Sequence, residues 1–204
     1  LRPLPVQDAQ DLVNLAAPGP KPGSTSCNQA GGCDEVFSYP MFRDLQREQT
    51  PFTEIAAHVR FGTNLAYGGE TISAGGELVS GSYFPVLGLQ PALGRLLGPA
   101  DDRVIGESPV VVLSHHYWRS RLDEDPDVIN DTLIVNGQAL TIVGVAPPDF
   151  TGTTLGNRPF IFVPLTLRAR LGANDAFEAR RSYWLYLFGR LNPDTSLAQA
   201  QTAV

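Results

Sequence analysis

Short apolar runs, separated by glycine, proline and polar residues, define the pattern of this chain. The most apolar runs are Val110–Leu113, Phe160–Val163 and Trp184–Phe188. Runs of this length, rich in β-branched or aromatic side chains, are typical of buried strands. None approaches the roughly 18 consecutive apolar residues of a membrane-spanning helix. The pattern therefore predicts a globular unit that contains a sheet.

Glycine-containing pairs predict where the chain turns between strands. Asn136-Gly137 lies between two apolar segments, and Asn-Gly accepts the positive φ angles of a two-residue hairpin turn. Gly68-Gly69 has the same place between the strand-like segments 64–67 and 71–80. Segment 55–61 predicts a separate strand before them.

Serine residues just before apolar segments predict where helices begin. Ser38 precedes one such segment, and Ser114 precedes another directly after a strand. Ser196 starts a final helix in which Leu197 and Ala200 are expected to face the core. Helices and strands mix without strict alternation along the chain, so the sequence predicts the α+β class.

The composition is that of a folded, acidic protein. The chain has 204 residues with 20 Gly and 17 Pro, in agreement with many turns and short elements. Its 21 acidic residues outnumber 15 Lys and Arg, so it lacks the basic surface that binds nucleic acid or anionic lipid. The sequence starts at Leu1 without an initiator methionine and stops at Val204 in a helix-like stretch. We therefore expect an excised domain of a longer protein.

The two cysteines, Cys27 and Cys33, flank a short glycine-containing segment. A local disulfide would close a small ring, worth about 2 kcal/mol in the chain-entropy model, and would indicate an oxidising compartment. Two free thiols and half of a metal site are the alternatives. A metal site needs about four ligands, and His58, His115 and His116 have no metal-finger spacing to this pair. The local disulfide is the favoured interpretation.

Ser114-His115-His116 is the most tempting candidate for catalysis, as a nucleophile beside a base or as two imidazoles for a metal. Neighbouring helical residues point about 100° apart and do not face each other. The chain has no Gly-x-Ser-x-Gly elbow and no His-Glu-x-x-His motif. Ser114 is better explained as a helix cap, and a hydrolase using Ser114 with His115 or His116 is the least favoured hypothesis.

Acidic groups and glycine pairs suggest two other kinds of site. Asp101-Asp102 and the acidic group at 123–127 lack the alternation and glycine of a calcium loop, so we expect solvated carboxylates. Gly31-Gly32, Gly68-Gly69 and Gly75-Gly76 are not followed by the Lys and Ser/Thr of a phosphate-binding loop. Turns explain these pairs.

Six short segments form a recognisable ordered set along this chain: Phe37-Ser38-Tyr39-Pro40, Val79–Gly88, Pro91–Arg95, Pro109–Ser114, Val135–Gln138 and Ile142–Pro147. Taken in order, these segments resemble the extracytoplasmic core domain of MacB/FtsX-type ABC permeases. The resemblance covers about residues 37–200, nearly the whole chain, although each segment alone is short.

The resemblance implies a two-lobed α+β fold. Both chain ends, residues 1–70 and 160–204, are expected to form a βαβ-based, porter-like lobe. Residues 71–159 form an inserted β-rich lobe in this prediction. Residues 18–36 form a mobile loop that contains the cysteine pair.

The resemblance also implies a function without bond-making chemistry. The domain is expected on the extracytoplasmic (periplasmic) face of the membrane, between two transmembrane helices of a permease, where it transmits ATPase-driven motion to cargo or partner proteins. The implied partners are the permease's own transmembrane helices, a cytoplasmic ATPase domain or subunit, and a second permease copy or an adaptor protein. No catalytic, cofactor-binding or metal-binding residue is assigned. The alternative is a soluble secreted module that binds a small molecule or a peptide.

Overall fold

The computed structural model describes residues 6–27, 32–48 and 51–203. The α-helices are α1 (Tyr39–Arg47), α2 (Tyr83–Leu87), α3 (His115–Arg121) and α4 (Leu197–Ala203), and the 3-10 turns are Ala9–Asp11, Cys33–Glu35, Pro99–Asp102, Pro126–Val128 and Leu165–Leu167. The strands are β1 (Leu12–Asn14), β2 (Ser24–Thr25), β3 (Val36–Phe37), β4 (Phe52–Tyr67), β5 (Glu70–Val79), β6 (Leu93–Gly94), β7 (Val110–Leu113), β8 (Thr132–Val135), β9 (Gln138–Val145), β10 (Ile161–Pro164), β11 (Ser182–Tyr183) and β12 (Leu185–Leu191). In this part of the chain no helix has the length and apolar character needed to cross a membrane.

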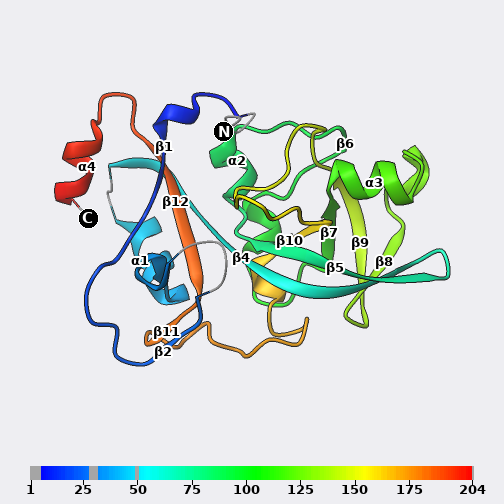
Figure 1. The fold of residues 1–204 in the computed structure, drawn as a ribbon, viewed down its shortest axis with the longest axis horizontal. Helices are drawn as coiled ribbons and strands as arrows, with labels where there is room; N and C mark the ends of the chain where they lie inside the picture. Colours follow the sequence, from blue (N-terminus) through cyan, green and yellow to red (C-terminus); the bar gives the residue numbers. More distant parts are fainter. Residues whose placement is uncertain (1–5, 28–31, 49–50, 204) are drawn as a thin grey trace.

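One large mixed sheet organises the fold (Figure 1). Its strands follow the order β1-β12-β4-β5-β10-β7-β9-β6, with β3 beside β12 and β8 beside both β4 and β9. β2 and β11 form a small parallel pair apart from this sheet. Strands and helices mix within one architecture, which confirms the α+β class predicted from the sequence.

β4 and β5 form a long antiparallel hairpin that crosses the molecule (Figure 1). Its turn is the predicted Gly68-Gly69 pair, whose φ angles are 57° and 86°. From this turn the ladder continues without a shift to His58, which lies opposite Val79. The predicted break near Gly62 is wrong, because β5 pairs with β4 through that glycine and keeps it in one strand.

The hairpin closes into a ring with strands from the middle of the chain. β5 pairs with β10, β10 with β7, β7 with β9 and β9 with β8, and β8 returns to the far end of β4. Side chains alternate between two apolar clusters along these strands. Leu113 and Ile161 belong to the main core, whereas Val112 and Phe162 belong to a second cluster around α2.

Elements from both chain ends pack around the first half of β4. β12 pairs with β4, with Leu187 opposite Ala57, and β1 and β3 pair along β12. The side chain of Ser38 caps α1 as predicted, by accepting a hydrogen bond from the Met41 amide at 3.4 Å. Figure 1 shows α1, α4, β1 and β12 at one end of the molecule, with the tip of the β4–β5 hairpin at the other.

Strand pairing crosses both predicted lobe boundaries. A boundary at residue 71 separates β5 from β4, and one at residue 160 assigns β10 to a different lobe from its neighbours β5 and β7. The main apolar core also extends under elements of both predicted lobes. The division into two lobes stays a prediction, and residues 28–31 of the predicted mobile loop lie outside the described residues.

Asp101 and Asp102 differ from the sequence expectation of solvated carboxylates. They are only 8% and 7% exposed. Asp101 accepts two hydrogen bonds from the Arg95 guanidinium, at 2.7 and 2.8 Å. Asp102 accepts hydrogen bonds from the backbone amides of Gly81 and Thr166, at 3.1 and 3.0 Å. Both carboxylates are therefore structural groups that tie loops together.

Leu197 also differs from its expected place. Ala200 is buried in α4 as predicted, but Leu197 is 52% exposed. Leu197 is the first residue of α4 and lines an apolar hollow together with Leu45 and Phe52. The side chain therefore lies beside the core, with part of its surface open to solvent.

Candidate functional site

Two ionisable side chains meet within the sheet, between β4 and β5. His58 donates its Nδ1–H to Oε1 of Glu77 at 2.7 Å. Glu77 is fully buried and His58 is 6% exposed. The register explains the contact, because His58 lies opposite Val79 and residues two apart on a strand share a face. A pair of this kind is costly to bury, which marks its surroundings as the first candidate site.

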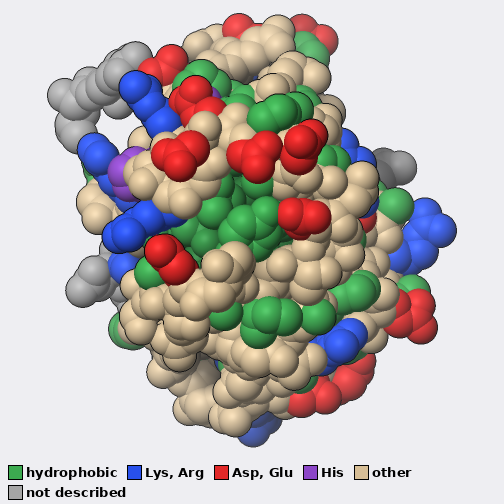
Figure 2. Space-filling view, turned by 90° about the vertical axis from the view of Figure 1, so that its right-hand side faces the viewer, with side chains coloured by type: hydrophobic (Ala, Val, Ile, Leu, Met, Phe, Trp, Pro, Cys, Tyr) green, Lys and Arg blue, Asp and Glu red, His purple; other side chains and the backbone are tan. Residues whose placement is uncertain are grey.

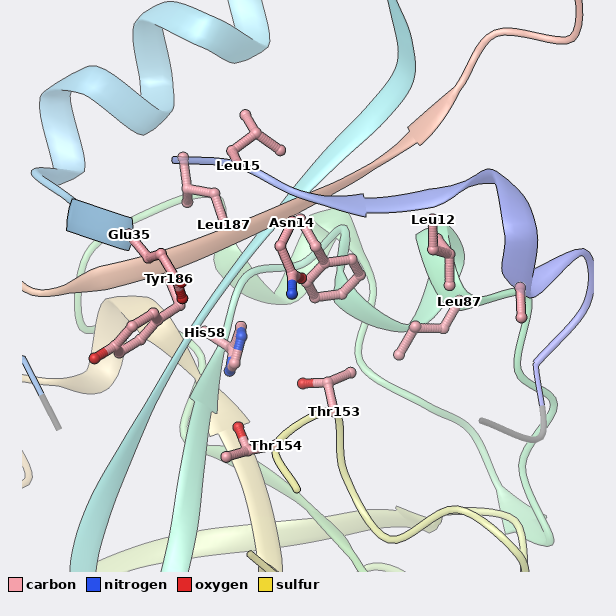
Figure 3. A pocket seen from close by; sticks show the side chains of 12 residues that line it. Leu12, Asn14, Leu15, Glu35, His58, Leu87, Thr153, Thr154, Tyr186 and Leu187 are labelled. Carbon is pink, nitrogen blue, oxygen red and sulfur yellow. The ribbon is translucent and has the colours of Figure 1, made fainter. Parts of the chain in front are cut away.

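A cavity of about 210 Å³ lies beside His58 (Figure 3). Its polar lining consists of the side chains of Asn14, Glu35, His58, Thr153, Thr154 and Tyr186, and β1, α2 and β12 add apolar walls. Figure 3 shows Asn14 directed into this space from β1, and Thr153 and Thr154 directed into it from the loop after β9. The cavity thus lies where elements from the chain ends meet a loop from the middle of the chain.

Two buried polar atoms near this cavity have no hydrogen-bond partner within the described ranges: Oε2 of Glu77 and Oγ1 of Thr154. Thr153, in contrast, shares a hydrogen bond of 3.0 Å with the hydroxyl of Tyr83. Burial and the nearby Glu77 carboxylate raise the pKa of Tyr83 well above its usual value, so this hydroxyl stays neutral. An unsatisfied buried polar atom costs about 1–3 kcal/mol. A hydrogen-bonding occupant of the cavity would remove that cost at Thr154.

The arrangement can bind polar groups, but it does not assemble a nucleophile. A histidine oriented by a carboxylate is a general base only when its second nitrogen reaches a hydroxyl, thiol or water to be activated. Within the described residues, no Ser, Thr or Cys side chain is hydrogen-bonded to the His58 ring. The second ring nitrogen of His58, Nε2, can accept a hydrogen bond when the imidazole is neutral and donate one when it is protonated. The cavity therefore suits a small molecule that forms hydrogen bonds.

Comparison with known proteins assigns the fold to a family. Residues 4–204 match the MacB-like periplasmic core domain. The chain belongs to this family. It matches the periplasmic region of MacB from Actinobacillus actinomycetemcomitans with a TM-score of 0.64 and 17% identity, over 81% of this chain and 70% of that one. No curated protein sequence matches it.

A second solved structure shows the same fold. The extracellular domain of the noncanonic ABC-type transporter YknZ from Gram-positive bacteria matches with a TM-score of 0.61 and 15% identity, over 83% of this chain and 79% of that one. The sequence-based recognition of a MacB/FtsX-type core domain, and its extracytoplasmic location, are thus confirmed.

In this MacB-like domain, the predicted catalytic candidates Ser114, His115 and His116 line one small hollow, but their side chains make separate contacts. Ser114 caps α3 by accepting a hydrogen bond from the Tyr117 amide at 3.2 Å. The ring of His115 packs edge-on against Trp118, and the ring of His116 packs edge-on against Phe160. Among the described residues, no hydrogen bond joins the Ser114 hydroxyl to either imidazole. Ser114 is thus a helix cap, as the sequence indicated.

Cys27 and Cys33 form the predicted local disulfide, with their Cα atoms 5.1 Å apart. The acidic group at 123–127 lies in the loop after α3, and Asp123 and Glu124 have left-handed φ angles of 50° and 56°. Within the part of the chain that the structure describes, no cluster of three or more His, Cys, Asp and Glu side chains could hold a metal ion.

The His58–Glu77 pair was missed by the sequence analysis, although a signal for it exists. In a hairpin with a two-residue turn, opposite residues have a constant sum of residue numbers, so the Gly68-Gly69 turn alone places His58 opposite Val79. That register brings Glu77 to the same face as His58. The cavity has no comparable signal, because its walls come from segments far apart in the sequence.

Proposed function

We propose that this MacB-like domain is a non-catalytic part of an ABC permease and transmits ATPase-driven motion to cargo or partner proteins outside the membrane. The observation that carries the proposal is the long β4–β5 hairpin. The first half of β4 pairs with β12 from the chain end, and the tip of the hairpin pairs with β8 from the middle of the chain. A stiff element shared in this way can pass a displacement from one end of the domain to the other.

The position of the polar cavity favours a hinge between two groups of elements. One group comes from the two chain ends, and the other comes from the middle of the chain. Asn14 and Tyr186 from the chain ends line this cavity together with Thr153 and Thr154 from the middle of the chain, and Asn14 points into the space between them. Close-packed interiors resist displacement. Movement between the two groups therefore costs least where this cavity interrupts the packing.

One hydrogen bond from Arg190 links the two groups, because Val86 belongs to the middle of the chain, whereas Gln7 and Asp8 belong to the same chain-end group as Arg190. The guanidinium of Arg190 on β12 donates hydrogen bonds to the backbone oxygens of Val86, Gln7 and Asp8, at 3.0, 2.8 and 3.1 Å. Gly88, directly after α2, lies against Gln7, and a Cβ built on Gly88 would be 3.6 Å from Cβ of Gln7. This distance falls in the range that a disulfide bridges.

The partners in this proposal follow from the role. They are the permease's own transmembrane helices, a cytoplasmic ATPase domain or subunit, and a second permease copy or an adaptor protein. Membership in a family of ABC-transporter domains supports the first two. The acidic composition argues against nucleic acid as a partner.

A reversible staple across the two groups tests the transmission of motion. In the complete permease, the pair Gln7→Cys with Gly88→Cys is oxidised, and ATP hydrolysis and transport are both measured. We expect ATP hydrolysis to continue while transport falls, and reduction to restore transport. Closure of the staple without any loss of transport would contradict the proposal.

Two controls separate stapling from other effects. Asn64→Cys with Ser73→Cys places a disulfide within the hairpin, between residues that lie opposite each other, and should leave transport unchanged. Reductant also opens the native Cys27–Cys33 bond, so the parent permease is assayed with and without reductant. The Gly88→Cys single variant reports the strain of a side chain at φ 67°.

The cavity favours a second candidate function, a soluble module that binds a small molecule or peptide. Its supporting observation is the unpaired Thr154 hydroxyl within a polar lining. A thermal-shift screen of small amines, sugars and short peptides on the 204-residue chain tests it. A saturable rise in Tm that Thr154→Val and Asn14→Ala abolish would favour this function over the first.

A further inference from the structure

The far end of the molecule carries a hollow of about 350 Å³ with an apolar floor, formed by the tip of the β4–β5 hairpin, α3 and the loop after α3. Its buried floor consists of Leu65, Tyr117 and Val128, and Ile72 and Leu122 form partly exposed walls. Figure 2 views this end and shows hydrophobic side chains gathered in its middle, with acidic side chains around them.

The rim of the hollow is acidic. Glu70, Asp123 and Asp125 line it together with a single cation, Arg121. Asp131 stands close by and accepts a hydrogen bond from the Tyr67 hydroxyl at 2.6 Å. This hydrogen bond, with burial and the charges of Asp131 and Asp125, raises the pKa of Tyr67 to about 12. The hollow therefore lies in a negative electrostatic field.

Charge and shape together restrict the occupant. Anionic lipid and nucleic acid would be repelled by this rim. A second copy of the same face would bring acid against acid. A metal ion lacks its ligands, because the described residues contain no cluster that could hold one. A basic partner with an apolar anchor satisfies both the rim and the floor.

We propose that this hollow is a docking site for a basic protein segment, which inserts one large apolar side chain between Leu65, Ile72 and Leu122 and sets Lys or Arg beside Glu70, Asp123 and Asp125. The inference rests on the proposed function, because it names the surface at which a partner receives motion. The hollow lies at the opposite end of the molecule from α1 and α4 (Figure 1). A partner held there is at the end of the hairpin, where a rotation of the domain moves it furthest.

The test uses the 204-residue chain and a defined probe, the peptide Lys-Arg-Trp-Arg-Lys with blocked ends. Its affinity is measured by tryptophan fluorescence at low and high salt, and its site is mapped by amide chemical shifts. We expect shifts centred on Ile72 and Leu122 and weaker binding at high salt. Shifts centred on another face, or no binding at low salt, would overturn the proposal.

Variants of the chain separate specific docking from general attraction between opposite charges. The triple variant Glu70→Gln, Asp123→Asn, Asp125→Asn should weaken binding about tenfold, which corresponds to about 1.4 kcal/mol. The matched control, Glu107→Gln, Glu178→Gln, Asp194→Asn, removes the same number of exposed charges elsewhere and should bind as the parent does. Equal loss in both variants would overturn the proposal.

Two further peptides test the apolar anchor. Replacing the tryptophan with alanine should abolish the shifts at Ile72 and Leu122, and replacing the cations with glutamate should abolish binding. If the alanine peptide binds as well as the parent peptide, the hollow is not the docking site. These results are independent of the Gln7–Gly88 staple, so failure of docking and failure of motion transmission can be told apart.

Discussion

Glu77 faces His58 at 2.7 Å in the interior of the sheet, while its second carboxylate oxygen has no partner among the described residues. The pair connects the two strands of the hairpin at the edge of the polar cavity. The His58–Glu77 pair therefore both links β4 to β5 and forms part of the sheet side of the candidate site.

Removal of Glu77 should be strongly destabilising. Glu77→Ala leaves a buried imidazole without its acceptor, which should lower the free energy of unfolding by about 3 kcal/mol. Glu77→Gln keeps an acceptor oxygen and should be milder. Urea denaturation of both variants measures this, with the exposed Glu107→Ala as a control expected within about 0.5 kcal/mol of the parent. Equal stability of Glu77→Ala and Glu107→Ala would rule out a structural role for the pair.

Asp102 should make stability depend on pH. Burial raises its pKa to about 6, against the effect of the backbone amides of Thr166 and Gly81. The folded state therefore holds the proton more tightly than the unfolded chain, whose value is about 3.9. The tighter binding of this proton adds to the free energy of unfolding. This contribution is fully present below about pH 4 and is lost as pH rises through about 6, a change of about 3 kcal/mol.

Asp102→Asn, which cannot ionise, isolates this effect. Urea denaturation of parent and variant at several pH values gives the difference in unfolding free energy at each pH. We expect the parent to lose stability relative to the variant between about pH 4 and pH 7. A difference that is constant with pH would show that Asp102 keeps an ordinary pKa.

Gly144 should tolerate no side chain. It lies on β9 between β6 and β7, and a Cβ at this position would collide with the backbone oxygen of Arg95. Gly144→Ala should therefore cost about 3 kcal/mol or more. The matched control is Gly62→Ala on β4, where a Cβ meets nothing within 4 Å; it should be neutral or slightly stabilising. Thermal unfolding of the two variants side by side decides the matter.

The Cys27–Cys33 bond should stabilise the domain modestly. Replacing both cysteines with serine opens a small ring, and the chain-entropy model assigns about 2 kcal/mol to such a ring. A thiol assay on the denatured chain should find no free thiol before reduction and two afterwards. Free thiols in protein isolated from an oxidising compartment would contradict the predicted pairing.

Local signals in the sequence predicted the local parts of this fold. The Asn136-Gly137 turn has the expected positive φ angles of 48° and 80°, and the side chains of Ser38 and Ser114 cap the helices that they precede. These features depend on hydrogen bonds and backbone angles within a few residues. Propensity and spacing therefore determine them without knowledge of the rest of the chain.

Long-range features were beyond that reasoning. The ring closes where Leu65 on β4 meets Val135 on β8, and β10 lies between strands that precede it by many residues. Asp101 and Asp102 looked like loop carboxylates because their partners, Arg95, Gly81 and Thr166, become visible only in three dimensions. Burial of an acid is decided by such partners rather than by its own neighbours in sequence.

The pairing of β1 with β12 has a consequence for how the chain reaches its native state. Leu12 lies opposite Arg190, so the first strand has no neighbour in the sheet until the last strand is present. The first half of β4 likewise gains its partner β12 only when that later segment is present. Contacts between such distant segments slow folding, because a long loop must close before any of them forms. The sheet can therefore be completed only after β12 has been synthesised.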